Sequence, residues 1–246
     1  MIEWFLTRVL KKPLVLDFDD AIYVPYISPT YGRLVSSLKF PRKTEANLRL
    51  SRQVIAGNRL LADYALRFNR NVTIIPTVVD VGQYRVENRM SDTLPVLGWI
   101  GSPTTTQYLK PIIPVLRELS RRHHFVLRVV GANEHIQIDG VVVQNEPWRL
   151  EREIADFQFK AIQYMAAGLP CVASPVGVNK EIIQDGVNGF VANTPQEWLE
   201  KLSLLIKDPA LRARLGAEGQ QTVKRRYSLD AHAPRLLAVL QAAAGS

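Results

Sequence analysis

Three aspartates near the start of the chain have types and spacing suited to metal or phosphate chemistry. Asp17, Asp19 and Asp20 follow a predicted strand over 13–18, and carboxylates in a D-x-D arrangement can hold Mg²⁺. A magnesium-dependent phosphatase would use Asp17 and Asp19. However, Ala21 stands where that chemistry normally has Thr or Val, and no later acidic pair on a glycine-bearing loop completes a metal site. The alternative is a cluster that caps the next element, and we assign no metal.

The stretch at 159–189 holds elements that would position a binding site. It reads FKAIQYMAAGLPCVASPVGVNKEIIQDGVNG. Apolar residues at helical spacing predict a helix that ends at Gly168, and the apolar run at 171–173 predicts a strand covered on both faces. A turn around Gly177 leads into a second helix, which the dipeptides DG and NG end. This order of elements predicts an α/β fold.

A candidate anion site follows a strand that opens at Leu94. The sequence PVLGWIGSPTTTQYL predicts this strand, a turn at Gly101 and Ser102, and a helix that runs to about His123. Such a turn presents backbone N–H groups and the positive end of a helix dipole to an anion. The G-x-G-x-x-G spacing of dinucleotide sites is missing. The next strands are predicted at 125–131 and 141–143.

Composition limits the class of protein and its partners. The 246 residues suffice for one large domain or two small ones, and 47% hydrophobic and 22% charged residues are ordinary for a globular protein. A net charge of +8 favours anionic partners, but no motif indicates nucleic-acid binding. Cys171 is the single cysteine and lies in an apolar run, which predicts a buried thiol. No apolar run reaches the length of a membrane span and no signal peptide is recognised, so we expect a cytoplasmic location.

The first residues predict an amphipathic helix. Its apolar face comprises Ile2, Phe5, Leu6 and Val9, with Arg8, Lys11 and Lys12 beside it. Because a strand follows at once, we expect this helix to pack on a sheet. The alternative is a helix that lies on a membrane surface, which would make the protein peripheral at the inner face of the membrane.

The resemblance to a known family rests on several segments. The stretch at 159–189 resembles the nucleotide-sugar-binding core of GT-B glycosyltransferases of family 4, which reads E-x-M-A-x-G-x-P-V-V-A-S, a glycine-containing loop, and E-I-I/V-x-D-G-x-N-G. VIAGN and the later IPTVVD are similar to the last two β–α units of the N-terminal domain in that family. The D-x-D-D-A segment also occurs in that domain, so the resemblance places Asp19 and Asp20 near an interdomain cleft.

The resemblance implies an α/β fold of two Rossmann-like domains, of which the first is incomplete. We expect a partial N-terminal, acceptor-side domain at 1–84, a linker at 85–93, a nucleotide-sugar-binding domain at 94–230, and a C-terminal helix at 231–246 that crosses back to the first domain.

The resemblance also implies retaining transfer from a UDP- or GDP-linked sugar to a saccharide or lipid-linked acceptor, with no metal or other cofactor. The donor diphosphate would contact Gly101, Ser102 and Lys160, and the ribose would contact Gln163. The loop Val176, Gly177 and Val178 would lie beside the donor, and Trp148 would stack on the base or lie in the core.

The chain departs from the family pattern in several places. The first half of the N-terminal domain is missing, and a core strand with its loop is missing between 151–156 and Phe159. Many members carry two glutamates with seven residues between them, where this chain has Ala155 and Gln163, and Ser102 replaces an arginine. The alternative is therefore an inactive or fragmentary homologue that at most binds nucleotide.

Overall fold

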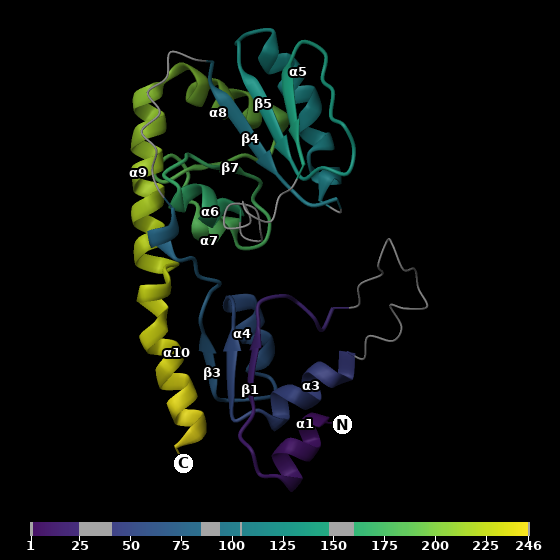
Figure 1. The fold of residues 1–246 in the computed structure, drawn as a ribbon, viewed down its shortest axis with the longest axis vertical. Coiled ribbons are helices and arrows are strands. Elements are labelled where there is room, and N and C mark those ends of the chain that lie inside the picture. The colour runs from purple at the N-terminus through teal and green to yellow at the C-terminus, as the bar shows by residue number, and fades with distance from the viewer. Residues whose placement is uncertain (1, 25–40, 85–93, 104, 148–159, 246) are drawn as a thin grey trace. The chain divides into compact units, whose positions relative to one another are not determined.

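The computed structural model describes residues 2–24, 41–84, 94–103, 105–147 and 160–245 (Figure 1). The chain divides into two compact units. Unit 1 comprises Met1–Val78 and Leu229–Ser246, and unit 2 comprises Val79–Ser228. Trp148, Ala155 and the expected linker at 85–93 lie outside the described residues.

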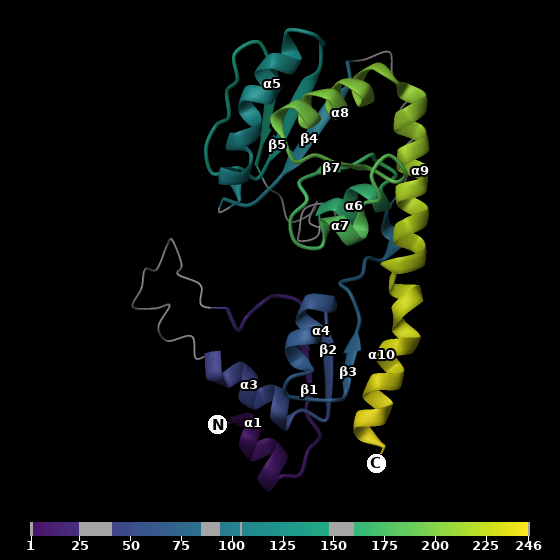
Figure 2. The same cartoon turned by 180° about the vertical axis from the view of Figure 1, so that it is seen from behind.

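Unit 1 is built on a parallel sheet with strand order β1-β2-β3 (Figure 2). The strands are β1 (Val15–Phe18), β2 (Gln53–Ala56) and β3 (Val72–Ile74). The helices are α1 (Ile2–Trp4), the π-helical η1 (Phe5–Val9), α3 (Pro41–Leu50), α4 (Arg59–Ala65) and α10 (Leu229–Ala244). The central strand β2 is the most buried of the three, and α4 and α10 both pack on it. The side chain of Asn58 caps α4 by accepting a hydrogen bond from the Leu61 N–H at 3.0 Å.

The prediction that the first helix packs on the sheet through its apolar face is wrong. Ile2, Phe5, Leu6 and Val9 are all exposed. Lys11 has a φ of 52° and reverses the chain after η1, so that the helix lies beside α3 instead. The helical spacing of apolar residues predicts which side chains share a face, but it does not predict which way that face points.

Unit 2 contains a parallel sheet of order β4-β5-β6 and a separate parallel pair, β7 and β8. The strands are β4 (Val96–Ile100), β5 (Val126–Val130), β6 (Val142–Glu146), β7 (Val172–Ala173) and β8 (Phe190–Val191). The helices are η2 (Val81–Gln83), η3 (Thr106–Tyr108), η4 (Lys110–Ile112), α5 (Ile113–Ser120), α6 (Lys160–Ala166), α7 (Asn179–Ile182), α8 (Pro195–Lys207) and α9 (Pro209–Arg226). The strands predicted after Leu94 and at 125–131, 141–143 and 171–173 are found, although β6 continues to Glu146, beyond its predicted end.

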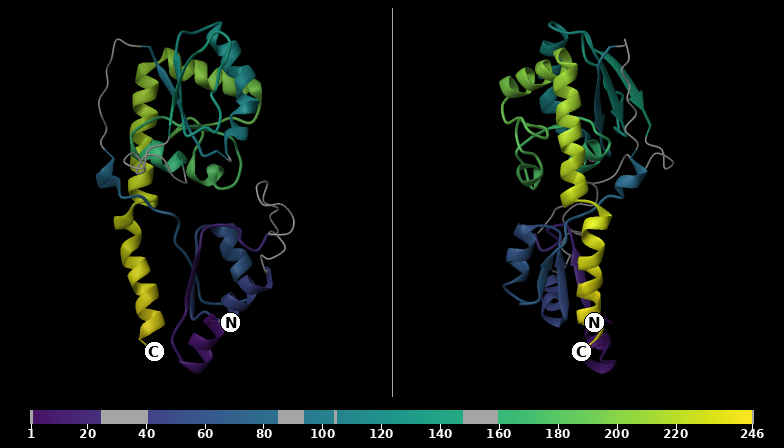
Figure 3. Two further views of the ribbon diagram at one scale, coloured as in Figure 1. Left: turned by 45° about the vertical axis from the view of Figure 1, so that its right-hand side comes forward. Right: turned by 90° about the vertical axis from the view of Figure 1, so that its left-hand side faces the viewer.

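The helix predicted to start just after Ser102 starts later than expected. Two 3₁₀ turns, η3 and η4, come first, and α5 begins only at Ile113. Pro111 and Pro114 have no N–H to donate, which prevents a continuous α-helical ladder through this segment. α5 then packs beside α8 (Figure 3).

The core of unit 2 around α6, which includes Ile162, Met165 and Val223, depends on close contact between α9 and the turn that ends α6. Gly168 has a φ of 70° and ends α6 as the sequence predicts. Gly216 of α9 lies directly against it, because a Cβ at Gly216 would come within 2.0 Å of the Gly168 carbonyl oxygen. Gly219, one turn later, is less crowded, because a Cβ there would lie 3.2 Å from Met165 Cγ and from the Asn188 carbonyl oxygen. Glycine at position 216 lets the two backbones touch.

We expect Gly216→Ala to destabilise the protein by ~2 kcal/mol, because the added methyl group overpacks a backbone contact. Alanine otherwise favours helix formation, so any loss reports the collision with Gly168. The measurement is the free energy of unfolding in urea. Gly98→Ala is the matched control, since nothing lies within 4 Å of a Cβ at Gly98. Equal losses in the two variants would contradict this packing.

Candidate functional site

The carboxyl ends of β4, β5 and β6 form one edge of the larger sheet in unit 2. The Gly101 N–H donates to the Val130 carbonyl at 2.9 Å, and the Gly131 N–H donates to the Glu146 carbonyl at 3.1 Å. These bonds hold the ends of the three strands together. In doubly wound α/β folds, ligands bind outside the carboxyl ends of parallel strands, so this edge is the candidate site.

The turn after β4 is closed by its own side chains. The Ser102 N–H donates to Thr105 Oγ1 at 2.7 Å, and that hydroxyl donates back to the Ser102 carbonyl at 3.0 Å. The N–H groups of Thr105 and Thr106 also donate to the Ser102 carbonyl, at 2.9 and 3.2 Å. An anion at the Ser102 N–H must therefore take the place of the Thr105 hydroxyl. Because η3 is a three-residue 3₁₀ helix, no α-helix begins at this turn to direct a dipole at the anion.

An indole ring lies over the same turn. A Cβ at Gly101 would come within 1.9 Å of Trp99 Cη2, so glycine at this position leaves the space that the ring occupies. The sequence interpretation did not single out Trp99. Its signal is the spacing W-x-G, which puts both residues on one face of a strand that ends at the candidate site.

The side chain of Gln163, on α6, lies in the interior rather than at the surface. It is 8% exposed and hydrogen-bonds to Tyr84, next to η2. Burial raises the pKa of Tyr84 and the hydrogen bond to Gln163 opposes that rise. Gln163 therefore already has a partner inside unit 2. Lys160 is the first residue of α6.

The loop after β7 is fixed at its base and open at its tip. Asn179 Nδ2 donates to the Ser174 carbonyl at 3.0 Å. Gly177 has a φ of 55°, and nothing lies within 4 Å of a Cβ there. Val176 is 65% exposed, whereas Val178 packs against the core that includes α6. The loop thus exposes the apolar side chain of Val176 beside a base that backbone and side-chain hydrogen bonds hold in place.

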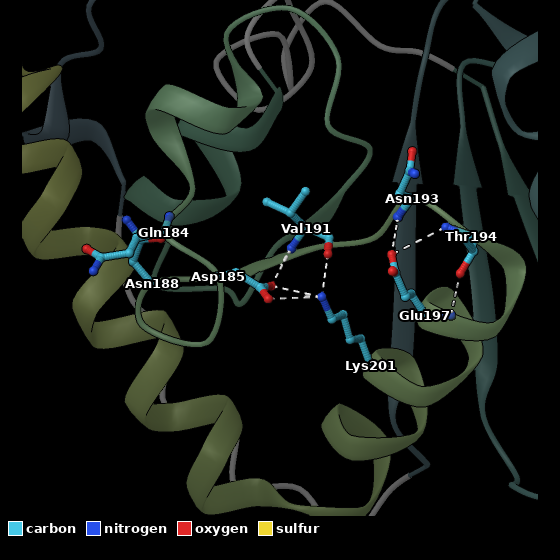
Figure 4. Close-up of polar contacts among 8 residues, drawn as sticks. All are labelled: Gln184, Asp185, Asn188, Val191, Asn193, Thr194, Glu197 and Lys201. Carbon is cyan, nitrogen blue, oxygen red and sulfur yellow. Dashed lines mark hydrogen bonds and ion pairs between the residues drawn. The ribbon is translucent and has the colours of Figure 1, made fainter.

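The DGxNG motif at 185–189 has a structural role (Figure 4). Asn188 is buried; its Oδ1 accepts from the Gln184 N–H at 2.8 Å and its Nδ2 donates to Thr222 Oγ1 at 3.2 Å. Gly189 lies against the Cys171 carbonyl, 2.9 Å from where a Cβ would be. The motif therefore joins α7 to β8 and ties both to α9. The sequence did not reveal β8, which has only two residues.

Asp185 of the same motif is held by β8 and α8 (Figure 4). Its carboxylate accepts from the Val191 N–H at 2.8 Å and from Lys201 Nζ at 3.0 and 3.1 Å. Lys201 also donates to the Val191 carbonyl. Burial raises the pKa of Asp185, but the bonds from Val191 and Lys201 outweigh burial and lower it below the usual value.

The aspartates of the D-x-D segment lie in unit 1, where Asp17 is in β1 and Asp19 follows its end. Burial, and then the charge of Asp19, raise the pKa of Asp17. Within the described ranges, no group of three or more His, Cys, Asp or Glu side chains is placed to hold a metal ion. The phosphatase alternative thus has no additional acidic ligands there. In the same ranges, no helix is long and apolar enough to cross a membrane.

One protein family and several individual proteins match parts of this chain in sequence. Residues 117–222 match the family described as Glycosyl transferases group 1. Spore coat protein SA of Bacillus subtilis is 25% identical over 149 residues, which are 58% of this chain and 38% of that protein. D-inositol 3-phosphate glycosyltransferase of Xylanimonas cellulosilytica is 35% identical over 85 residues, 34% of this chain and 20% of that protein. The chain thus matches well under half of the length of these relatives.

Solved structures show the same fold. The crystal structure of Anabaena HepE in complex with UDP-glucose has a TM-score of 0.71 at 16% identity, over 96% of this chain and 74% of that one. Sucrose-phosphate synthase from Thermosynechococcus elongatus has a TM-score of 0.69 at 13% identity, over 97% and 70%. The predicted α/β fold of the GT-B type, with Rossmann-like parallel sheets, is confirmed.

We expect the stability of the protein to fall as the pH drops through the lowered pKa of Asp185. A carboxyl group whose pKa is depressed by folding stabilises the folded state above its unfolded pKa, near 4, and stops doing so below its folded pKa. In the Asp185→Asn variant, the free energy of unfolding should fall less between about pH 5 and pH 2 than in the unmodified chain. The difference should be about 1 kcal/mol or less, because the Asp185 side chain is 52% exposed. Asp139→Asn, at a side chain 94% exposed, should leave that fall unchanged; an equal effect would contradict the role of Asp185.

We expect Cys171 to react with thiol reagents only after unfolding. The side chain is buried, and burial raises the pKa of its thiol to about 12, so almost no thiolate is present at neutral pH. The measurement is the rate of reaction with a chromogenic disulfide in buffer and in urea. Rapid reaction of the folded chain would contradict the burial, and since Cys171 is the single cysteine, the signal has one source.

Proposed function

We propose that this chain is a family 4-type retaining glycosyltransferase that binds a nucleoside diphosphate sugar at the carboxyl edge of the β4–β6 sheet. The observation that carries the proposal is the group 1 match over 117–222, which spans most of unit 2. The acceptor would be a saccharide or a lipid-linked sugar, and the location the cytoplasm. Anabaena HepE was solved with UDP and with UDP-glucose, so UDP-glucose is the first donor to test.

The turn after β4 would contact the diphosphate. Retaining transfer requires stabilisation of the charge that develops on the leaving diphosphate. The Ser102 N–H and hydroxyl can supply donors once Thr105 Oγ1 has moved, and the absence of a side chain at Gly101 allows close approach. Lys160 would add positive charge from the start of α6. No metal ion is required in this scheme.

The remaining contacts would orient the donor. We assign ribose recognition to Gln163, whose amide has both donors and an acceptor, although it must share them with Tyr84. The loop Val176–Val178 would lie beside the sugar, and Trp148 beside the base.

A second candidate function, nucleotide binding without transfer, is favoured by one observation. Ser102 stands where the resemblance expects an arginine and Ala155 where it expects a glutamate, so a cation for the leaving diphosphate and a contact to the donor sugar are replaced. A chain of this kind would bind UDP and release no sugar. Measuring binding and turnover separately distinguishes the two functions.

We expect saturable binding of UDP or UDP-glucose by calorimetry, and weakening of roughly tenfold or more by Ser102→Asp, because a carboxylate there repels the diphosphate. GDP and GDP-linked sugars should be titrated in parallel. Ser120→Asp is the matched control: Ser120 is the last residue of α5, away from the turn after β4. Its binding constant should equal that of the unmodified chain.

Turnover is then measured as release of free UDP from UDP-glucose, with and without saccharide acceptors. Release would support the transferase, and binding without release would favour the second candidate. A cooperatively folded chain that binds none of the nucleotides would overturn both.

A further inference from the structure

The first helix of unit 1 presents apolar side chains to solvent and polar side chains to the protein. α1 and η1 are continuous from Ile2 to Val9. Ile2, Phe5, Leu6 and Val9 are 74, 48, 37 and 52% exposed; we call these four residues the N-terminal apolar face. Single exposed apolar residues are ordinary, but a contiguous set on one short helix indicates an interaction surface.

Polar contacts fix this orientation. Glu3 Oε1 lies 3.0 Å from Lys43 Nζ of α3, while the hydrogen bond from Thr7 Oγ1 to the Glu3 carbonyl at 2.9 Å lies within the helix. Glu3 and Thr7 are the less exposed residues of the helix. A hydrogen bond from its own backbone and the bond from Lys43 lower the pKa of Glu3 to about 2, so the pair stays ionised at neutral pH. The helix therefore contacts α3 through its polar side.

Basic residues border the apolar face. Arg8, Lys11 and Lys12 are exposed, and Lys43 already neutralises Glu3, the one acidic residue among positions 2–12. Burial of an apolar protein surface would not require these cations. A helix that lies in a bilayer interface combines an inserted apolar face with flanking lysines and arginines that meet anionic headgroups.

We propose that the N-terminal apolar face binds the surface of an anionic lipid bilayer, with Arg8, Lys11 and Lys12 against the headgroups. Trp4 suits this position, because indole rings favour the interface between headgroups and acyl chains. The contact would hold the protein at a membrane without a spanning helix. It uses unit 1 alone, so it stands or falls independently of nucleotide binding at Ser102 in unit 2.

The test is co-sedimentation of the full chain with vesicles of phosphatidylcholine, alone or mixed with phosphatidylglycerol. We expect binding to the mixed vesicles, weak binding to neutral ones, and loss of binding in high salt. Phe5→Ser combined with Val9→Ser should weaken binding by about tenfold or more, and so should Lys11→Gln combined with Lys12→Gln.

Matched controls keep the result specific. Leu60 and Leu66 are 64 and 52% exposed elsewhere in unit 1, and Lys224 and Arg225 are exposed cations on α9. Leu60→Ser with Leu66→Ser, and Lys224→Gln with Arg225→Gln, should leave binding within about twofold. All variants must show unchanged unfolding transitions.

Three outcomes would overturn the proposal. These are no binding to the mixed vesicles, equal binding to neutral and mixed vesicles, and binding that the N-terminal variants do not weaken. Light scattering during gel filtration tests whether a second copy of the chain covers the N-terminal apolar face instead. If the unmodified chain is a dimer and the Phe5/Val9 variant is a monomer, the face binds a second copy and the lipid proposal is wrong.

Discussion

The core of unit 2 around α6 depends on the direct backbone contact between α9 and the turn that ends α6. Gly216 meets the Gly168 carbonyl, which fixes where the chain leaves α6 and enters β7. The Cys171 carbonyl in turn meets Gly189, which sets β8 beside β7. Asn188 then returns to α9 through Thr222. One helix thus holds both ends of the segment from which the loop at 174–178 emerges, and the rigidity of that loop's base follows from these contacts.

Much of this frame could be predicted from the sequence. The end of α6 at Gly168, the strand at Cys171 and the turns of the DGxNG motif each depend on local chemistry, namely a left-handed glycine or a short apolar run. β8 could not be predicted, because two residues show no periodicity. The late start of α5 has a visible cause in Pro111 and Pro114, which the helical pattern around them obscured.

The site was harder to predict than the fold. Spacing places Ser102 after a strand and Gln163 on a helix, but it does not show that Thr105 and Tyr84 already bond to them. Which group bonds to which depends on rotamers and on packing between distant segments. For the same reason the sequence does not show that the first helix turns its apolar face outward. These features depend on tertiary contacts, which local pattern does not encode.

The closed turn at Ser102 is compatible with the proposed donor site when the energies are compared. Releasing the neutral bond from Ser102 N–H to Thr105 Oγ1 costs about 1 kcal/mol net, whereas a bond to a charged phosphate oxygen contributes about 1.5–3 kcal/mol. When the Thr105 hydroxyl moves it also gives up its bond to the Ser102 carbonyl, but that carbonyl keeps the bonds from the N–H groups of Thr105 and Thr106 at 2.9 and 3.2 Å. A neutral ligand gains nothing by this exchange. The turn would therefore open for a diphosphate and stay closed to uncharged sugars, and this selectivity follows from the internal bond that seemed to block the site.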